Sequence, residues 1–216
     1  MKRTLKRLSL VMIAAALVFT GCKKDQEEEN GGNGGGTTNA NPECVDLGLP
    51  SGTKWATFNV GASQPHEYGN YYAWGETTTK SEYTEENSVT MWQQISDFSG
   101  NATYDAARAN WGGTWRMPTK AEIEELRNNC TWTWTTQNGV NGYRVTGSNG
   151  NSIFLPAAGC CDGSSRYSVG EDGGYWSSTP DESYTNYAYE LFFGSGYHFV
   201  HWGYRGYGRT VRPVSD

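Results

Sequence analysis

The chain has 216 residues, enough for one domain of ordinary size with additional segments. Aromatic residues make up 14% of the sequence and include nine Trp, a composition that excludes disorder as the state of the main body. The formal net charge of -6 argues against a nucleic-acid partner, because phosphate binding needs clustered Lys and Arg.

Residues 1–21 have the pattern of an export signal. Four basic residues precede an apolar run at 8–19, which is too short to span a membrane comfortably. The run ends in FTGC at residues 19–22, which resembles the lipobox of bacterial lipoproteins. This resemblance implies cleavage before Cys22 and lipid attachment to Cys22. An ordinary secretory signal with an incidental Cys is the alternative.

Residues 22–42 are predicted to tether the protein to its lipid. The charged run KKDQEEE after Cys22 resembles the acidic export signal that sends lipoproteins of the Bacteroidetes to the outer face of the outer membrane. A solvated spacer is the alternative reading of this run. The following GGNGGGTTNANP is typical of a flexible linker. We therefore expect a lipid-anchored, surface-exposed protein of the outer membrane whose folded domain comprises residues 43–216.

The first half of this domain contains few regular elements. Residues 45–62 predict two short strands around a Pro50-Ser51-Gly52 turn, and residues 68–76 an extended segment. Residues 81–100 are polar and irregular, as in a surface loop. The sequence YDAARAN at residues 104–110 predicts a short helix, and Gly112-Gly113 should stop it.

The clearest helix signal follows Pro118. Thr119 and Glu122 form a capping box, in which each side chain satisfies a backbone amide of the first turn. Ile123 and Leu126 then share one helix face and predict its buried side. The acidic residues of this helix are expected on its solvated face rather than in an acid/base pair.

Short strands dominate the second half. TWTWTT at residues 131–136 alternates as a strand does and places Trp132 and Trp134 on one face. Residues 143–146 and 152–155 predict a hairpin. Two early helices followed by many short strands indicate an α+β domain.

Long phrases of the domain resemble a known family, the Fibrobacter succinogenes major paralogous domain, which is common in lipoproteins of gut Bacteroidetes. The phrases are VDLGLPSGTKWATFNVGA, YYAWGE, WGGTWRMPT, CTWTWTTQNGVNGYRVTG, NSIFLPAAG, GYWSST and VRPV. The resemblance covers nearly all of residues 43–216. It implies a C-type lectin-like fold of the type shared with formylglycine-generating enzymes, with two short helices, many short antiparallel strands and long loops. The sequence departs from the family at Cys44, Phe58 and Cys160-Cys161, which puts any family disulfide in doubt.

The cysteines predict no catalytic or metal site. Export through an oxidising compartment permits disulfides, and Cys44 with Cys130 is the pairing that we expect. A bridge between the adjacent Cys160 and Cys161 would be strained. No Cys/His spacing is typical of zinc, so neither a metal nor a cofactor is expected. The formylglycine-generating relatives need a reactive Cys pair near the C-terminus, and no pair here matches it.

The C-terminal stretch from 174 to 214 interleaves scaffold positions with aromatic rings. Six Tyr, three Phe, one Trp and two His occur between Tyr184 and Tyr207. Tyr mixed with Ser, Gly and Asn is typical of antibody-like binding surfaces. We therefore predict a face within about 160–207 that binds a protein or glycan ligand. The predicted contacts are Arg166, Tyr167, Tyr184, Asn186, Tyr187, Glu190, Phe192, Tyr197, His198, Phe199, His201, Trp202, Tyr204 and Tyr207.

Alternation separates scaffold from contact residues in this stretch. Tyr189, Leu191 and Phe193 are expected to face the core, which turns Glu190 and Phe192 outward. About a third of the outward rings are expected to belong to the core after all. His198 and His201 would face opposite sides of a strand and are interpreted as contact or surface residues, not metal ligands. Arg205 and Arg212 are expected to brace the frame through carboxylate or carbonyl contacts.

The same stretch resembles the variable region of proteins that diversity-generating retroelements target. In these systems, adenines of a template copy are randomised, and AAC codons can become codons for Tyr, His, Asp, Ser, Gly or Phe but never Lys, Gln or Met. No Lys, Gln or Met follows Asn138. Glu190 and Trp202 cannot arise from AAC and would come from other codons or be fixed. The resemblance implies a diversified receptor or adhesin.

Three alternatives to a diversified receptor remain open. The first is an adhesin or lectin of fixed specificity that stacks sugar rings on the same aromatic residues. The second is an oxidative modifying enzyme that uses Cys160 or Cys161, although no catalytic residue is predicted. The third is a structural pilus or surface-layer component.

Overall fold

A computed structural model describes residues 42–216. The predicted export signal, the lipid-bearing Cys22 and nearly all of the predicted tether therefore lie outside the described residues. The described part has two short helices and eleven strands, and the strands of each sheet are antiparallel, which agrees with the predicted α+β class. Within it, no helix is long and apolar enough to cross a membrane.

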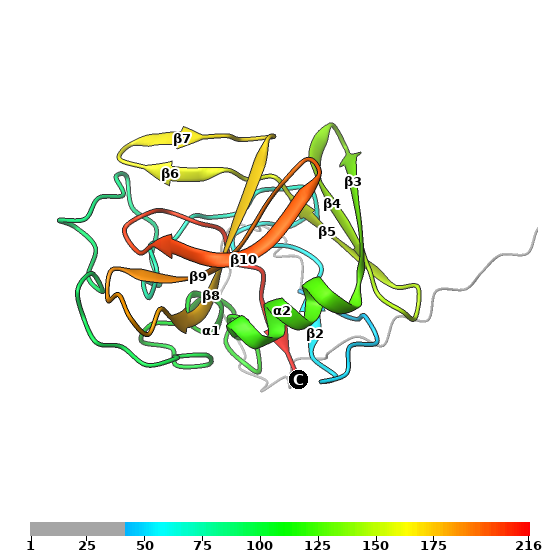
Figure 1. Cartoon of the computed structure of the whole chain (residues 1–216), viewed down its shortest axis with the longest axis horizontal. Coiled ribbons are helices and arrows are strands. Elements are labelled where there is room, and N and C mark those ends of the chain that lie inside the picture. The colour runs from blue at the N-terminus through cyan, green and yellow to red at the C-terminus, as the bar shows by residue number, and fades with distance from the viewer. Residues whose placement is uncertain (1–41) are drawn as a thin grey trace, which may run out of the picture.

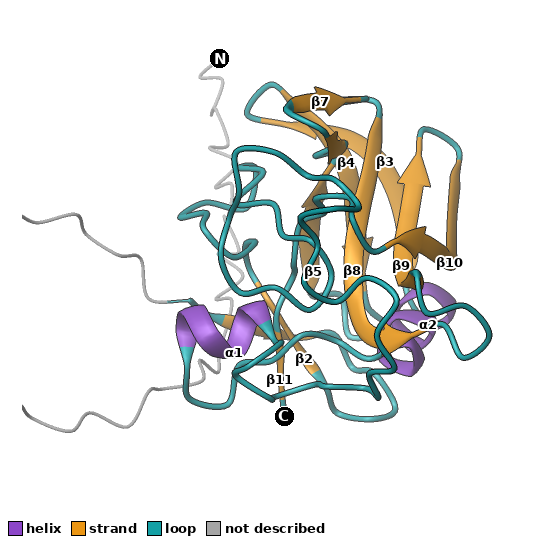
Figure 2. Cartoon of the chain, turned by 90° about the vertical axis from the view of Figure 1, so that its left-hand side faces the viewer, coloured by secondary structure: helices purple, strands orange, loops and turns teal. Residues whose placement is uncertain are grey.

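The two ends of the domain meet in a small sheet. β1 (Cys44–Asp46) pairs with β2 (Lys54–Ala56), and β11 (Val214–Ser215) pairs with the other edge of β2. The predicted turn between the first two strands is present, with the amide of Gly52 donating to the carbonyl of Leu49 at 3.0 Å. This sheet lies between the two helices in Figure 2.

Both predicted helices form. α1 (Ala106–Trp111) is capped by Asp105 and ends at Gly112, which has a φ of 66°. The capping box of α2 (Lys120–Asn129) is complete, and Ile123 and Leu126 are buried as predicted. Glu122 also forms an ion pair of 2.7 Å with Arg116, so the start of α2 is fixed to the segment before it.

A three-stranded sheet follows α2. It contains β3 (Thr131–Gln137), β4 (Val140–Thr146) and β5 (Ser152–Pro156) in that order. The register pairs Thr146 with Ser152, which confirms the predicted hairpin. Trp132 and Trp134 pack side by side against Tyr143, so their predicted common face is also confirmed.

The C-terminal stretch forms the largest strands of the domain. β6 (Cys160–Asp162) and β7 (Ser165–Tyr167) make a separate hairpin. β8 (Asp172–Pro180), β9 (Tyr187–Gly194) and β10 (Tyr197–Tyr204) form a sheet in which β9 is central and β10 is an edge strand. Figure 1 shows β10 crossing in front of the domain above α2, with the β6–β7 hairpin above β10.

The main hydrophobic core lies between α2 and the sheets. Leu191 and Phe193 of β9 pack there with Ile123 and Leu126 of α2, while Val200 of β10 is packed against its margin. A second core cluster joins Trp74 and other residues of the loop-rich half to Trp176 of β8. The predicted inward direction of Leu191 and Phe193 is therefore confirmed.

Arg212 joins distant parts of the chain from a fully buried position. Its guanidinium donates to Asn59 Oδ1 at 2.7 Å and to the carbonyls of Ala56 and Phe154 at 2.9 Å each. Burial lowers the pKa of this group to about 10. The bracing role that the sequence predicts is confirmed, with carbonyl and amide oxygens as the acceptors.

The predicted pairing of Cys44 with Cys130 is wrong. Cys130 carries a free thiol at the end of α2, where it packs against the main core. Burial, with a smaller effect of Glu125, raises the pKa of this thiol to about 11. Cys160 and Cys161 are also free thiols, so the strained bridge between neighbours does not form, as expected.

Replacing Arg212 with Met should lower the free energy of unfolding by about 3 kcal/mol, because three buried acceptors lose their donor. Urea unfolding of the variant measures this loss. Arg144→Met on the exposed side of β4 is the matched control and should change stability by no more than about 0.5 kcal/mol. Equal effects of the two substitutions would contradict the bracing role.

Candidate ligand-binding surface

The predicted contact residues of β9 and β10 divide between two faces of the sheet. The register places Phe199 opposite Phe192 and His201 opposite Glu190, while Tyr204 lies opposite Tyr187. Directly opposed residues share a face and neighbours along a strand do not. The single face that the sequence predicts is therefore two surfaces.

The first ring cluster consists of Phe192, Tyr197, Phe199 and His201. Its ring centroids lie 5.1–6.1 Å apart, within the range of favourable aromatic contacts. Tyr197 and Phe199 are exposed, whereas Phe192 and His201 are half-buried. Tyr197 also donates from its hydroxyl to Asp172 on β8 at 2.8 Å.

A buried ion pair supports the first ring cluster. Arg209 Nε lies 2.7 Å from Glu190 Oε2, and His201 Nε2 lies 3.0 Å from Glu190 Oε1. The carboxylate of Glu190 is fully buried, so its predicted exposure is wrong. The physical reason is that Arg209 covers the carboxylate. The guanidinium of Arg209 in turn lies 5.8 Å from the ring centroid of Phe192.

Two glycines provide the space for this ion pair. A Cβ on Gly174 would lie 2.7 Å from Arg209 Cδ, and a Cβ on Gly203 would lie 2.8 Å from Glu190 Cδ. A side chain at either position would require the charged groups to move. The small residues in the ring-rich stretch thus also have a structural role beneath the rings.

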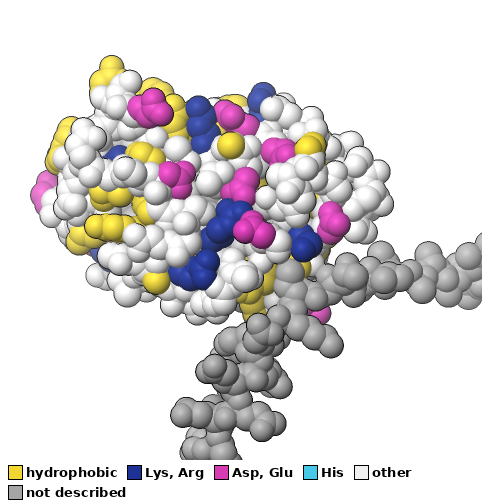
Figure 3. All heavy atoms as spheres, turned by 90° about the horizontal axis from the view of Figure 1, so that it is seen from below, with side chains coloured by type: hydrophobic (Ala, Val, Ile, Leu, Met, Phe, Trp, Pro, Cys, Tyr) yellow, Lys and Arg dark blue, Asp and Glu magenta, His cyan; other side chains and the backbone are white. Residues whose placement is uncertain are grey.

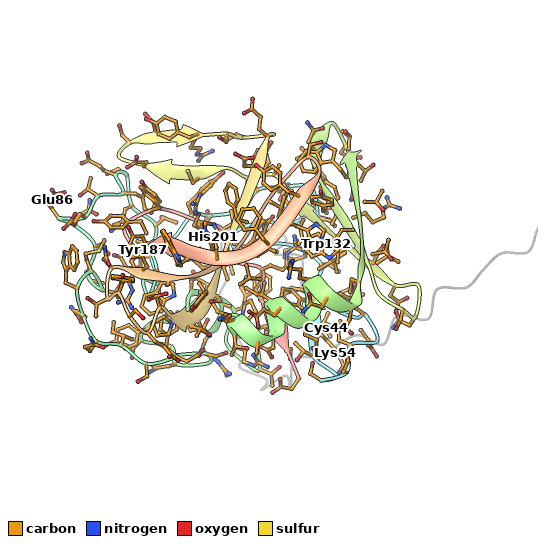
Figure 4. All side chains as sticks on the ribbon, in the orientation of Figure 1. Cys44, Lys54, Glu86, Trp132, Tyr187 and His201 are labelled. Atoms are coloured by element: carbon orange, nitrogen blue, oxygen red, sulfur yellow. The ribbon has the colours of Figure 1, made fainter. Side chains whose placement is uncertain are left out.

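The second ring cluster consists of Tyr184, Tyr187, Trp202, Tyr204 and Tyr207. Tyr187 is central in it, with centroid distances of 4.6 Å to Trp202 and 5.6 Å to Tyr204. Tyr184 and Trp202 are exposed. Figure 4 shows Tyr187 toward one end of β10 and His201 nearer its middle, so the two clusters also differ in position along the strands.

Trp92 joins the second ring cluster from a loop far away in sequence. Its indole donates to Glu85 Oε1 at 2.9 Å, and the hydroxyl of Tyr204 donates to the other oxygen of the same carboxylate. Trp92 is 58% exposed and has a φ of 62°, a conformation that costs a non-glycine residue about 1 kcal/mol or more. Sequence reasoning missed Trp92, because it assigned residues 81–100 to an irregular surface loop.

Arg205 fixes this loop to the end of β10. Its guanidinium donates to the carbonyls of Thr90 and Gln93 at 3.1 and 2.9 Å and lies 4.1 Å from the ring centroid of Trp74. Arg205 is 1% exposed, so these contacts are shielded from water. Its predicted role as a brace is confirmed.

Hydrophobic side chains gather at the left margin of Figure 3, the side on which β10 ends in Figure 1.

Four predicted contacts lie apart from the two clusters. His198 faces the opposite side from His201, as the strand spacing predicts, and stacks on Trp132 with centroids 4.5 Å apart. Arg166 extends over the ring of Tyr71. Tyr167 is exposed on β7, and Asn186 lies in the turn before β9.

The expectation that about a third of the outward rings belong to the core is wrong. All rings of the two clusters are exposed or half-buried, and those of Tyr197, Phe199 and Trp202 are among the exposed ones. Tyr189 is also unlike its prediction: the sequence predicts that it faces the core, but its side chain is only half-buried. The first residue of α2 covers this ring only in part, with Lys120 Nζ 4.0 Å from the ring centroid of Tyr189.

The pKa values of the two adjacent thiols of β6 are shifted in the direction expected of structural cysteines. Burial is the largest influence on both, and it raises the pKa of Cys160 and of Cys161. A nucleophilic cysteine needs the thiolate and hence a lowered pKa. No group of three or more His, Cys, Asp or Glu suited to a metal ion occurs among residues 42–216.

One family comparison bears on this region. Residues 117–214 match a family described as a domain of unknown function (DUF8237). No curated protein and no solved structure matches the chain. The matched segment includes α2 and both ring clusters, but it does not include Trp92.

The stack of His198 on Trp132 should make the fold sensitive to mild acid. Burial, with a smaller effect of Arg127, lowers the pKa of His198 below its usual value. The unfolded chain therefore binds a proton at this residue more readily, and the free energy of unfolding should fall as the pH drops from 7 through the folded-state pKa.

Urea unfolding at pH 7 and pH 5 measures this effect. His198→Phe should keep the stack and lose part of the acid sensitivity, whereas His66→Gln in the loop region should retain it. An unchanged pH dependence in His198→Phe would show that protonation of His198 does not control stability.

Proposed function

We propose that this chain is a lipid-anchored binding protein of the outer cell surface, a receptor or adhesin with a C-type lectin-like fold. Its two ring clusters, together with Trp92, contact a protein or glycan ligand. The observation that carries this proposal is the exposure of large rings above a buried polar frame. Tyr184 is 64% exposed, Trp202 53%, Tyr197 42% and Phe199 38%.

Such exposure is costly unless a partner covers it. Large apolar side chains grouped on the surface of a monomer commonly mark an interaction site. Tyr and Trp suit this role, because their rigid rings give a large contact area and lose little conformational entropy on binding. The hydroxyl, indole and imidazole groups of the same rings supply hydrogen bonds at the rim of the contact.

The frame beneath the rings is independent of their identity. Glu190, Arg205 and Arg209 hold the strands and the loop through buried contacts that involve mainly backbone and charged groups. The side chains of Tyr184, Tyr197 and Phe199 project away from this frame. They can therefore change without disturbing the core, which is the property that a diversified binding surface requires.

The same division agrees with diversification by a retroelement. Randomised AAC codons can encode Tyr and Phe, the residues at most ring positions. They cannot encode Glu190, and the side chain of Glu190 is the fully buried member of the ion pair. We infer that Glu190 belongs to the fixed frame and that Tyr184, Tyr197 and Phe199 are variable positions.

A glycan-binding lectin of fixed specificity is the second candidate. Trp202 and Trp92 favour it, because both are exposed and neither can arise by randomising AAC. Flat indole rings are suitable platforms for the apolar face of a sugar ring. In this case the second ring cluster would be the binding site, and the remaining rings would have a supporting role.

Two double variants test the contact surfaces separately. Tyr197→Ser with Phe199→Ser removes exposed rings of the first cluster, and Tyr184→Ser with Trp202→Ser removes those of the second. Each should leave the free energy of unfolding within about 1 kcal/mol of the parent and weaken binding at least tenfold to a ligand found on a glycan array or in a panel of host surface proteins.

Arg144→Ser on β4 is the control for these variants and should change neither property. A loss of more than about 3 kcal/mol in either double variant would show that its rings stabilise the core. Unchanged binding in both variants would place the ligand elsewhere on the domain.

The coding DNA tests the mode of diversification. Under the retroelement proposal, a near-copy of the 3′ end lies near the gene and differs from it only at adenines. Codons for Tyr184, Tyr197 and Phe199 should then vary among isolates, while codons for Glu190 and Arg209 should not. Absence of the copy, with invariant ring codons, would favour the lectin of fixed specificity.

A further inference from the structure

A polar pocket lies apart from the two ring clusters. Its volume is about 320 Å³, at the lower end of the range for small-molecule sites. The lining comes from two loop segments, at 69–71 and 79–83, and from the β6–β7 hairpin. Cys161 of β6 lines the pocket, whereas the neighbouring Cys160 interacts with Arg209 under the first ring cluster. Because neighbours on a strand face opposite sides, β6 separates the pocket from that cluster.

Arg166 provides the pocket with a positive charge that the protein does not neutralise. Its guanidinium lies 4.9 Å from the ring centroid of Tyr71, which holds the group in place. No carboxylate of residues 42–216 lies within 4 Å of it. Lys80, the other cation of the lining, is already paired with Glu76 at 3.0 Å and donates to Asn87 Oδ1 at 2.8 Å.

The pocket also presents hydroxyl groups that are free to bind a ligand. The side chains of Thr79, Ser81 and Ser164 line it and make no hydrogen bond within the described part of the chain. The hydroxyls of Tyr71 and Tyr83 donate instead to the carbonyls of Ala158 and Tyr71. These two rings therefore form a fixed wall, while the rim carries the available donors and acceptors.

We propose that this pocket binds the carboxylate of a small acidic sugar, such as a uronic or sialic acid. Arg166 takes the carboxylate, since a guanidinium fork matches two carboxylate oxygens. Thr79, Ser81 and Ser164 bind the hydroxyls of the sugar. The single unpaired positive charge of Arg166 matches a ligand with one negative charge. The net negative charge of the chain disfavours ligands that carry several negative charges.

Isothermal titration of the full-length chain tests the proposal. Glucuronate and N-acetylneuraminate are the acidic probes, glucose is the neutral one, and inorganic phosphate tests for a general anion site. At least one acidic sugar should bind with a Kd in the millimolar range or tighter, and at least tenfold more tightly than glucose or phosphate. Binding should weaken as the salt concentration rises.

Arg166→Gln should weaken the binding of the acidic sugar at least tenfold, and Arg144→Gln on β4 should leave it unchanged. The melting temperatures of both variants should equal that of the parent, since both side chains are exposed. Equal binding of glucose and glucuronate, preference for phosphate, absence of binding, or full binding by Arg166→Gln would each overturn the proposal.

The pocket and the ring clusters can be tested independently. The double variant of Tyr197 and Phe199 should keep full affinity for the acidic sugar, because β6 separates these rings from the pocket. Arg166→Gln should likewise keep the binding of a ligand that needs the rings. Loss of sugar binding in the ring variant would place the sugar on the ring clusters and overturn the assignment to the pocket.

Discussion

The buried ion pair between Glu190 and Arg209 is the interaction on which the first ring cluster depends. A carboxylate without solvent contact is strongly unfavourable unless a cation neutralises it, so the pair requires both side chains in one arrangement. That arrangement fixes β9 against the segment that follows β10. Arg209 then presents its guanidinium to Phe192 and Tyr207, which belong to different clusters. The charged pair thereby determines where aromatic groups of both surfaces can lie.

Buried arginines hold the frame at three places, and their partners differ. Arg209 has a carboxylate, whereas Arg205 and Arg212 donate mainly to backbone carbonyls. A carbonyl acceptor is present whatever the side chain at that position, so such a contact tolerates sequence change in its partner. The loop that carries Trp92 is held in this manner through Thr90 and Gln93. Aromatic surfaces above such contacts can vary while the backbone beneath them keeps its course.

Local signals predicted much of the fold, while the site needed contacts between distant segments. The capping box at Thr119 and the hairpin after Tyr143 depend on neighbours in sequence, and both were predicted. The burial of Glu190 depends on Arg209, Gly174 and Gly203, which alternation along one strand does not reveal. Trp92 reaches the second ring cluster through Glu85 and Tyr204, and a loop assignment carries no information about this contact. The division of the rings between two faces required the register of β9 and β10.

Incomplete cover on both faces of the sheet explains how β9 and β10 each supply two surfaces. Even the central strand β9 contributes Phe192 to one face and Tyr187 to the other, and both side chains are half-buried. Helix α2 covers only the part of one face near Leu191 and Val200, and beyond its first turn Tyr187 and Trp202 remain accessible. The other face of β10 carries Phe199 and His201. Successive residues of β10 therefore belong to different surfaces, so a substitution at one of them should alter one surface and leave the other intact.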